Sequence, residues 1–183
     1  PLAYFLAAHE HAFAAFQGCP ARLMIDNLTS AVLKRVLGEA PVFNPRYLDF
    51  ARHWGFGISA CNVGKGHEKG RVENGVGYVK KNFLNGLELL DFSAVNPAAQ
   101  LWLDTIANVR IHGETHQRPV DLFAQERPHL QPLNPRPYDI ARIETGRVSK
   151  WFRVAVDANR YSVPPEHVGR RVTVKAYPDR VCI

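Results

Sequence analysis

The sequence predicts an α/β fold that is followed by a small C-terminal β-barrel. In the first two thirds of the chain, helical patterns alternate with short apolar runs that fit strands. After a proline-rich stretch, apolar and polar residues alternate with period two, which is typical of strands joined by tight turns. Of the 183 residues, 46% are apolar and 22% are charged, a balance that favours a globular chain over a disordered one.

The α/β part is expected to hold helices over residues 2–16, 45–54, 68–83 and 97–112, and strands over 22–25 and 58–63. The helix from residue 45 has clear start signals, because Asn44 can cap it and Pro45 fits the first helical position. The run from Arg22 to Ile25 is apolar and stops at Asp26, so it predicts a buried strand with a carboxylate at its C-terminal end.

A linker is expected where four prolines lie between Arg127 and Pro137, since proline fixes φ and lacks an amide donor. We therefore assign residues 1–126 to the α/β part, 127–146 to the linker and 147–183 to the barrel. The barrel strands are expected around residues 152–156, 161–163, 172–174 and 181–183, and the last of them would be truncated.

Basic charge is concentrated in two regions of the chain, whose formal net charge is +6. Residues 62–81 carry five basic and two acidic groups, and residues 136–183 carry ten and five. Residues 82–135, which lie between them, are net acidic. Clustered basic charge attracts polyanions such as nucleic acid, although a solvated basic surface explains the same pattern.

Several classes of protein are disfavoured. No uncharged apolar run is long enough to cross a membrane. The three cysteines form no CxxC pair and none lies near His112 and His116, which argues against a zinc finger or a disulfide framework and favours a reducing compartment. The chain starts at Pro1 and its one methionine is Met24, so we expect a fragment.

The helix expected over residues 68–83 has an apolar stripe, whose members are Val72, Val76, Val79 and Phe83. Glu73 lies one residue, about 100° of rotation, from this stripe. Such a carboxylate can face a cleft if the stripe packs on the sheet. Gly77 and Lys80 follow on the same side, which leaves that face open near Glu73 and basic beyond it.

Asp26 and Glu73 are thus two candidate metal-binding carboxylates. Ligand sites in α/β proteins lie at the carboxyl ends of parallel strands, and magnesium prefers oxygen ligands. Paired metals can then activate a nucleophile in phosphodiester chemistry. The alternative from spacing alone is an ordinary turn aspartate and a surface glutamate.

Four segments of the chain resemble transposases of the IstA type, which belong to the DDE superfamily of transposases and retroviral integrases. They are MIDN (24–27), PVFNPRYLDFARHWGF (41–56), GKGHEKGRVENGVGYVKKNF (64–83) and NVRIHGETHQRPVDLF (108–123). Two later segments, VDANRYSVP (156–164) and VGRRVTVKA (168–176), resemble the small β-barrel that follows the core in Mu-like transposases.

The resemblance implies a partial RNase H-like integrase core in which three acidic residues bind two Mg²⁺ or Mn²⁺ ions. Asp26 matches the second aspartate of this triad and Glu73 matches its glutamate, with Glu68 as a rival. The first aspartate, the leading strands and the N-terminal DNA-binding helices would lie upstream, so this fragment alone is expected to be inactive.

The resemblance also implies a function for the parent protein. It would cleave the ends of a mobile element and join them to target DNA, in the bacterial cytoplasm at the nucleoid. Its residues expected to contact DNA are Lys65, Lys69, Arg71, Lys80, Lys81, Arg110, His112, Arg170 and Arg171. Helix-end or strand-edge roles explain the last four equally well.

The expected partners are DNA, further copies of the same protein and a separate AAA+ helper ATPase. The chain has no GxxxxGK[ST] loop, so ATP chemistry would lie in that helper. Two other functions stay open: a non-catalytic remnant that only docks on DNA or on sister subunits, and a related RNase H-like nuclease without strand transfer.

Overall fold

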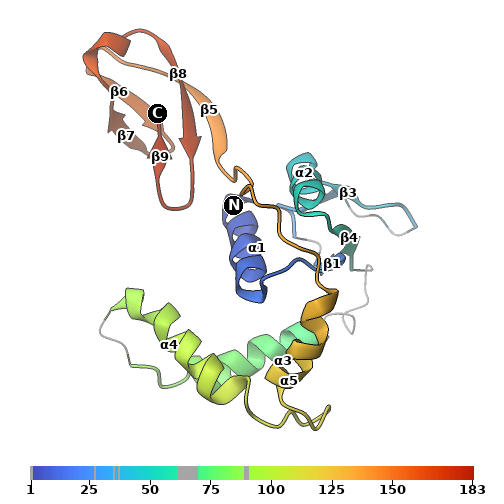
Figure 1. Ribbon diagram of the computed structural model, residues 1–183. Helices are drawn as coiled ribbons and strands as arrows, with labels where there is room; N and C mark the ends of the chain where they lie inside the picture. Colours follow the sequence, from blue (N-terminus) through green and yellow to red (C-terminus); the bar gives the residue numbers. More distant parts are fainter. Residues whose placement is uncertain (1, 27, 35, 37, 62–69, 89–90) are drawn as a thin grey trace. The chain divides into compact units, whose positions relative to one another are not determined.

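The structure is a computed structural model that describes the chain except residues 1, 27, 35, 37, 62–69 and 89–90 (Figure 1). The side chain of Arg71 also lies outside the described part. The chain divides into two compact units, which we describe separately. The C-terminal unit consists of Pro1–Ala15 with Asn134–Ile183, and the central unit of Phe16–Leu133.

The structure is mixed α/β. Its α-helices are α1 (Leu2–Phe16), α2 (Pro45–Trp54), α3 (Gly70–Val79), α4 (Val95–Trp102) and α5 (Pro119–Glu126). Its strands are β1 (Arg22–Ile25), β2 (Val32–Lys34), β3 (Val42–Phe43), β4 (Gly57–Ala60), β5 (Arg142–Arg147), β6 (Arg153–Val156), β7 (Asn159–Ser162), β8 (Arg171–Ala176) and β9 (Val181–Cys182). Short helical turns are η2 (Lys80–Leu84), η3 (Phe92–Ala94), η4 (Leu103–Ala107), η5 (Arg127–His129) and η6 (Pro165–His167). No described helix is long and apolar enough to cross a bilayer.

The central unit contains a two-stranded parallel sheet, in which β1 pairs with β4 from Arg22 opposite Gly57 to Ile25 opposite Ala60. β2 and β3 form a separate antiparallel pair. The expected helix of residues 45–54 is confirmed as α2, with the Asn44 side chain accepting a hydrogen bond from the Arg46 amide. Aromatic residues of α2 form the core beside the sheet, where the rings of Phe50 and Phe56 meet edge to face at 6.0 Å.

The apolar stripe of α3 does not pack as the sequence suggested. Val72, Val76 and Val79 are 69%, 46% and 37% exposed, and only Phe83 of that stripe is buried. The helix packs through Tyr78 instead, which lies about 100° of rotation or more from each of the three valines. α3 and η2 pack on Trp102 of α4, whose ring lies 5.5 Å from that of Tyr78 and 5.4 Å from that of Phe83.

The fourth expected helix also differs from its prediction, since α4 starts at Val95 and the π-helical turn η4 ends at Ala107 rather than at residue 112. Its buried residues are Trp102 and Ala107. Three other apolar residues of the expected helix, Leu101, Ile106 and Val109, are exposed.

The C-terminal unit is not the closed barrel that the sequence suggested. All residues from 134 to 183 are described, and they form a three-stranded antiparallel sheet, β5-β8-β9, and a separate hairpin, β6-β7. The two share a core of Val148, Val154, Val156, Val163 and Val174. The hairpin therefore packs on the face of the sheet instead of continuing its hydrogen bonding.

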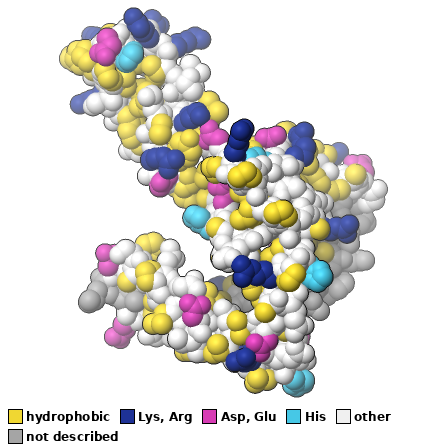
Figure 2. All heavy atoms as spheres, in the orientation of Figure 1, with side chains coloured by type: hydrophobic (Ala, Val, Ile, Leu, Met, Phe, Trp, Pro, Cys, Tyr) yellow, Lys and Arg dark blue, Asp and Glu magenta, His cyan; other side chains and the backbone are white. Residues whose placement is uncertain are grey.

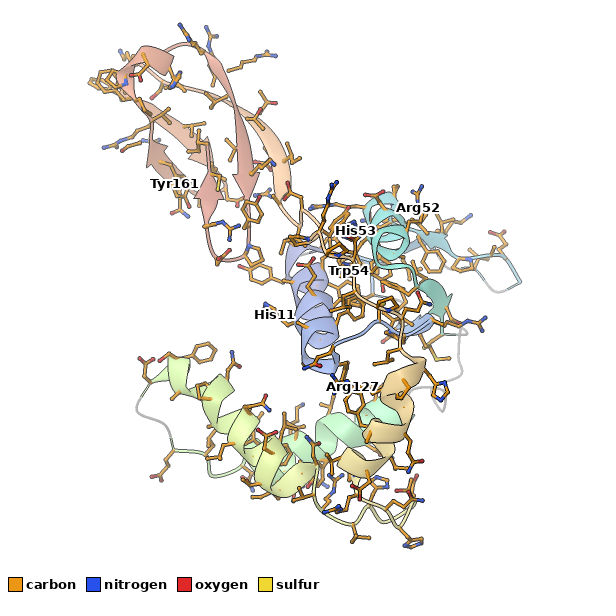
Figure 3. All side chains as sticks on the ribbon, in the orientation of Figure 1. His11, Arg52, His53, Trp54, Arg127 and Tyr161 are labelled. Atoms are coloured by element: carbon orange, nitrogen blue, oxygen red, sulfur yellow. The ribbon has the colours of Figure 1, made fainter. Side chains whose placement is uncertain are left out.

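The proline-rich stretch is attached to the rest of the chain at several points. In the central unit, Cys19 and Gln131 exchange backbone hydrogen bonds of 2.9 and 2.8 Å, and Arg127 after α5 donates to the Gln17 side chain (Figure 3). In the C-terminal unit, Lys175 of β8 bonds to Asp139 at 2.8 Å. The strand β5 begins at Arg142, within the range assigned to the linker.

Candidate active site and nucleic-acid interface

Asp26 lies at the carboxyl edge of the parallel sheet. It follows β1 directly and is exposed. The Cys61 amide donates to the Ile25 carbonyl at 3.0 Å, so the β1–β4 pairing continues up to this edge. The chain that leaves β4 departs from the same edge, because the two strands are parallel. Asp26 thus stands where α/β proteins place their ligands.

Glu73 lies in the first turn of α3 and is exposed. An acidic residue there interacts favourably with the positive end of the helix dipole. This interaction alone would also explain a glutamate at this position without a metal-binding role. Residues 62–69, which join β4 to α3, lie outside the described residues. This range includes two of the expected phosphate contacts, Lys65 and Lys69, and the rival carboxylate Glu68.

The described residues contain no complete metal site, since no group of three or more His, Cys, Asp or Glu among them could hold an ion. The chemistry of Asp26 and Glu73 suits magnesium, because both supply carboxylate oxygens. Their metal-binding role remains a prediction.

A hollow of about 490 Å³ opens beside α3, one residue beyond Glu73. Its walls come from α3 and from the loop that follows η4, and they include Asn74, Tyr78, Arg110 and His112. The Arg110 guanidinium lies 4.0 Å from the centre of the Tyr78 ring. Arg110 and His112 were candidates from the sequence, and the structure brings both to the helix that carries Glu73.

The loop that carries His112 is held by its own hydrogen bonds. The His112 amide donates to the Gln117 carbonyl at 3.0 Å, and the His116 amide donates to the His112 carbonyl at 2.8 Å. The Thr115 amide approaches His112 Nδ1 at 3.4 Å. These contacts give the loop a defined shape beside α3.

Lys80 and Lys81 are exposed on η2, at the end of α3 away from Glu73. Seven residues of helix separate Lys80 from Glu73, which is a rise of about 10 Å. The helix therefore presents a carboxylate at its start and two cations at its end. This arrangement fits a polyanion that runs along the helix.

A second basic area lies in the C-terminal unit, where Lys and Arg side chains are spread over the surface (Figure 2). Arg170 and Arg171 are exposed, and Arg171 pairs with Arg147 in the β5–β8 register. Sequence reasoning missed three further arginines that line one hollow of this unit, Arg147, Arg153 and Arg160. The sequence signal that could have found Arg153 is the period-two alternation of β6. This alternation places Arg153 and the buried Val154 on opposite faces of the strand.

Cys19 and Cys61 are buried, Cys182 is exposed, and all three are free thiols. Burial raises the pKa of the Cys19 thiol to about 11, so this group stays protonated at neutral pH.

Comparison with known proteins identifies related sequences along nearly the whole chain. Residues 133–183 match the Mu transposase C-terminal domain. The chain is 35% identical over 165 residues to the transposase for insertion sequence element IS21 of Pseudomonas aeruginosa. The aligned region covers 90% of this chain and 42% of that protein.

Other relatives give the same result. A transposase of Aminobacter aminovorans is 34% identical over 182 residues, covering 96% of this chain and 35% of that protein. The transposase for an IS21-like element of Bacteroides fragilis is 32% identical over 159 residues, covering 86% and 30%. The chain thus spans less than half the length of these relatives. By this similarity, which extends through both units, the chain belongs to the family of insertion-sequence transposases of the IS21 (IstA) type.

Proposed function

We propose that the protein to which this chain belongs is a DNA transposase, which cleaves the ends of a mobile element and joins them to target DNA. The observation that carries the proposal is the similarity to IS21-type transposases over 86–96% of the chain, a stretch that includes both Asp26 and Glu73. The positions of these carboxylates, at a sheet edge and in the first turn of a helix, are compatible with that role.

The central unit would be part of an RNase H-like integrase core. Two parallel strands are too few to bury both faces of a sheet, and Met24 on β1 is 58% exposed. The exposed valines of α3 are a second uncovered apolar surface. Further strands of such a core would cover surfaces of this kind. The proposed organisation is an α/β part over residues 1–126, a linker over 127–146, whose last residues from Arg142 belong to β5, and a C-terminal domain over 147–183.

In the complete core, Asp26 and Glu73 would hold Mg²⁺ or Mn²⁺ together with a third carboxylate. Two bound ions would lower the pKa of the attacking water and neutralise charge on the leaving oxygen. The chain's own task is to position these carboxylates and to hold the DNA backbone beside them. Lys65, Lys69, Arg71, Lys80 and Lys81 would contact phosphates, while Arg110 and His112 would extend that contact along α3.

The proposed partners are DNA, other copies of the transposase and a separate AAA+ helper ATPase. The protein would work in the bacterial cytoplasm, on the nucleoid. Arg170 and Arg171 would add DNA contacts from the C-terminal unit, where both side chains are exposed.

The proposal is tested with a full-length transposase that contains this chain, assayed with its helper for cleavage of element ends and for strand transfer. We expect the wild type to perform both steps and Asp26→Asn to perform neither while still binding DNA. Cleavage without strand transfer would identify a nuclease instead. DNA binding without either reaction in the wild type would identify a non-catalytic remnant.

A further inference from the structure

The C-terminal unit has a basic hollow of about 380 Å³ that the roles assigned above do not use. It is lined by Arg147, Ser149, Trp151, Arg153, Ala155 and Arg160. It thus combines three guanidinium groups with one indole ring. This pairing of cations and an exposed aromatic surface is the composition of sites that hold unpaired nucleotides.

The register of the β6–β7 hairpin explains why a hollow exists there. Ala155 lies directly opposite Arg160, and antiparallel partners project on the same face. Arg153 shares that face, because it is two residues from Ala155 on β6. The opposite face of β6 is occupied by Val154 and Val156, which are buried in the core. The small Ala155 therefore leaves a gap between two long arginine side chains.

A hydrogen-bonded turn holds Trp151 at the rim of this gap. Ser149 Oγ accepts from the amides of Trp151 and Arg153, at 3.3 Å each, and the Phe152 amide donates to the Ser149 carbonyl at 3.0 Å. Trp151 nevertheless remains 69% exposed. An exposed tryptophan on a turn held in this way offers the face of its ring for stacking.

The arginines of the hollow are available to an anion. Neither Arg153 nor Arg160 forms an ion pair with any carboxylate that the structure describes, whereas Arg142 on the same unit is bonded to Glu144 and Asp157. Arg147 Nε donates to the Gly169 carbonyl at 3.1 Å, which fixes the direction of its side chain and leaves its terminal nitrogens for a ligand. Lys150, whose Nζ lies 5.2 Å from the centre of the Trp151 ring, adds a further cation beside the indole.

We propose that this hollow binds one nucleotide of an unpaired DNA strand, with the phosphate between Arg153 and Arg160 and the base stacked on Trp151. An unpaired strand is favoured over a duplex, because a paired base presents no free face to a tryptophan at the surface. The inference rests on the proposed function, in which strand ends are released from a duplex and carried to a target.

The experiment uses the whole 183-residue chain and two probes, an oligothymidylate of about 12 nucleotides and a duplex of equal length. Tryptophan fluorescence reports on the site directly. Trp151 is 69% exposed, whereas Trp54 and Trp102 are 8% and 9% exposed. An added strand should therefore quench the fluorescence of Trp151 more than that of the two buried tryptophans. Binding is measured for the wild type and for Trp151→Ala, Trp151→Phe, Arg153→Ala, Arg160→Ala and Arg180→Ala.

We expect the single strand to quench the wild-type fluorescence and to bind more tightly than the duplex. Trp151→Ala should remove the quenching and weaken binding of the single strand about 5- to 150-fold, which is the loss of one stacked base. Trp151→Phe should keep most of the affinity, because a phenyl ring also stacks. Replacing Arg153 and Arg160 together by alanine should lower the salt slope by about 0.7, the value for one phosphate contact, and each single change should lower it by less.

Arg180→Ala is the matched control. It removes one positive charge from the same unit, but Arg180 already bonds to Asp179 and lies over the Tyr177 ring, outside the hollow. Equal losses for Arg180→Ala and Arg153→Ala, or unchanged binding for Trp151→Ala, would overturn the proposal. Equal affinity of single strand and duplex, with the same dependence on Trp151, would overturn the choice of an unpaired strand.

The outcome is separable from that of the proposed function. If Asp26→Asn abolishes transposition but Trp151→Ala binds the single strand normally, only this inference fails. If Asp26→Asn stays active and the Trp151 quenching persists, the active-site assignment fails and the nucleotide site stands.

Discussion

A methyl group placed on Gly146 would lie 2.2 Å from Cγ2 of Val154. The hairpin that contains β6 therefore approaches β5 so closely that β5 has room only for hydrogen at this position. Val154 is 1% exposed and belongs to the valine core of the C-terminal unit, together with the half-buried Tyr161 (Figure 3). This close contact is one part of the packing between the hairpin and the three-stranded sheet.

We expect Gly146→Ala to destabilise the C-terminal unit by about 1–3 kcal/mol, the usual cost of an added methyl group in a packed core. Chemical denaturation with a probe on this unit measures the change. Gly113→Ala is the control, since a methyl group there would meet nothing within 4 Å. If the packing is as described, Gly146→Ala combined with Val154→Ala will cost less than the two single changes added together. Simple additivity would mean that these residues do not touch.

The start of α2 provides a second test. The Asn44 side chain accepts from the Arg46 amide at 3.0 Å, and its Nδ2 donates to the Ser30 carbonyl at 3.1 Å. Asn44→Ala removes both bonds and should cost about 0.5–2 kcal/mol of unfolding free energy. Asn44→Asp keeps the capping acceptor and loses the donor, so its cost should be smaller. Equal costs for the two variants would show that the cap contributes nothing.

The stability of α1 should depend on pH through His9. Burial lowers the pKa of His9, against the opposing effect of its hydrogen bond to the Phe5 carbonyl at 2.7 Å. Below the ordinary histidine pKa of about 6.5, the unfolded chain binds a proton more readily than the folded one. The free energy of unfolding should therefore fall as the pH drops below about 6.5 toward the folded-state pKa.

Thermal unfolding between about pH 5 and pH 7.5 measures this dependence. His9→Gln removes the titrating group and should flatten the profile, whereas His11→Gln, at an exposed position of the same helix, should leave it unchanged. A wild-type profile with no loss of stability on acidification would contradict the assignment.

Salt dependence tests the basic end of α3. Replacing both Lys80 and Lys81 by alanine should weaken binding to all DNA sequences alike and lower the salt slope by about 0.9 per lost phosphate contact. Lys34→Ala is a suitable control, because Lys34 is already paired with Glu39 at 3.4 Å. A slope equal to that of the wild type would show that these lysines are solvated surface charges.

Local signals in the sequence were sufficient to predict the elements whose ends are fixed by their own residues. The helix α2 has the bounds expected from Asn44 and Pro45, and it ends where Gly55 takes a left-handed conformation. The strand β1 has its expected bounds, and Asp26 follows it as predicted. Its predicted burial is wrong, because only Ile25 of its four residues is buried, while β4 is its one partner in the sheet among the described residues. In each case the residues that stop the element are part of the pattern itself.

Features that depend on distant partners could not be predicted in this way. The valines of α3 define an apolar stripe, but Tyr78, on another side of the helix, and Phe83 of η2 are the residues that pack on Trp102. Strand alternation showed which side of β6 is buried, but not that the hairpin packs face to face with β5. The strand β5 itself was missed, because its residue that faces the core is a glycine and not an apolar side chain. The side chain of Val154 takes up the space that a larger residue at position 146 would need.

Among the candidate site residues, Arg110 and His112 illustrate the same limit. Their positions along the chain are far from Tyr78, yet the structure places all three around one hollow. The pairing of Asp26 with Glu73 depends on the segment between β4 and α3 and on the remainder of the core. It is therefore the part of the account that most needs a direct measurement.

That measurement is strand transfer by the full-length transposase with its helper, compared among Glu73→Gln, Glu68→Gln and Asp26→Asn. Each change removes one negative charge and keeps the size of the side chain, so DNA binding serves as the control for folding. We expect Asp26→Asn and Glu73→Gln to abolish both end cleavage and joining while Glu68→Gln stays active. If Glu73→Gln is active and Glu68→Gln is inactive, the metal ligand is Glu68. If Asp26→Asn and Glu73→Gln are both active, the two-carboxylate site is contradicted.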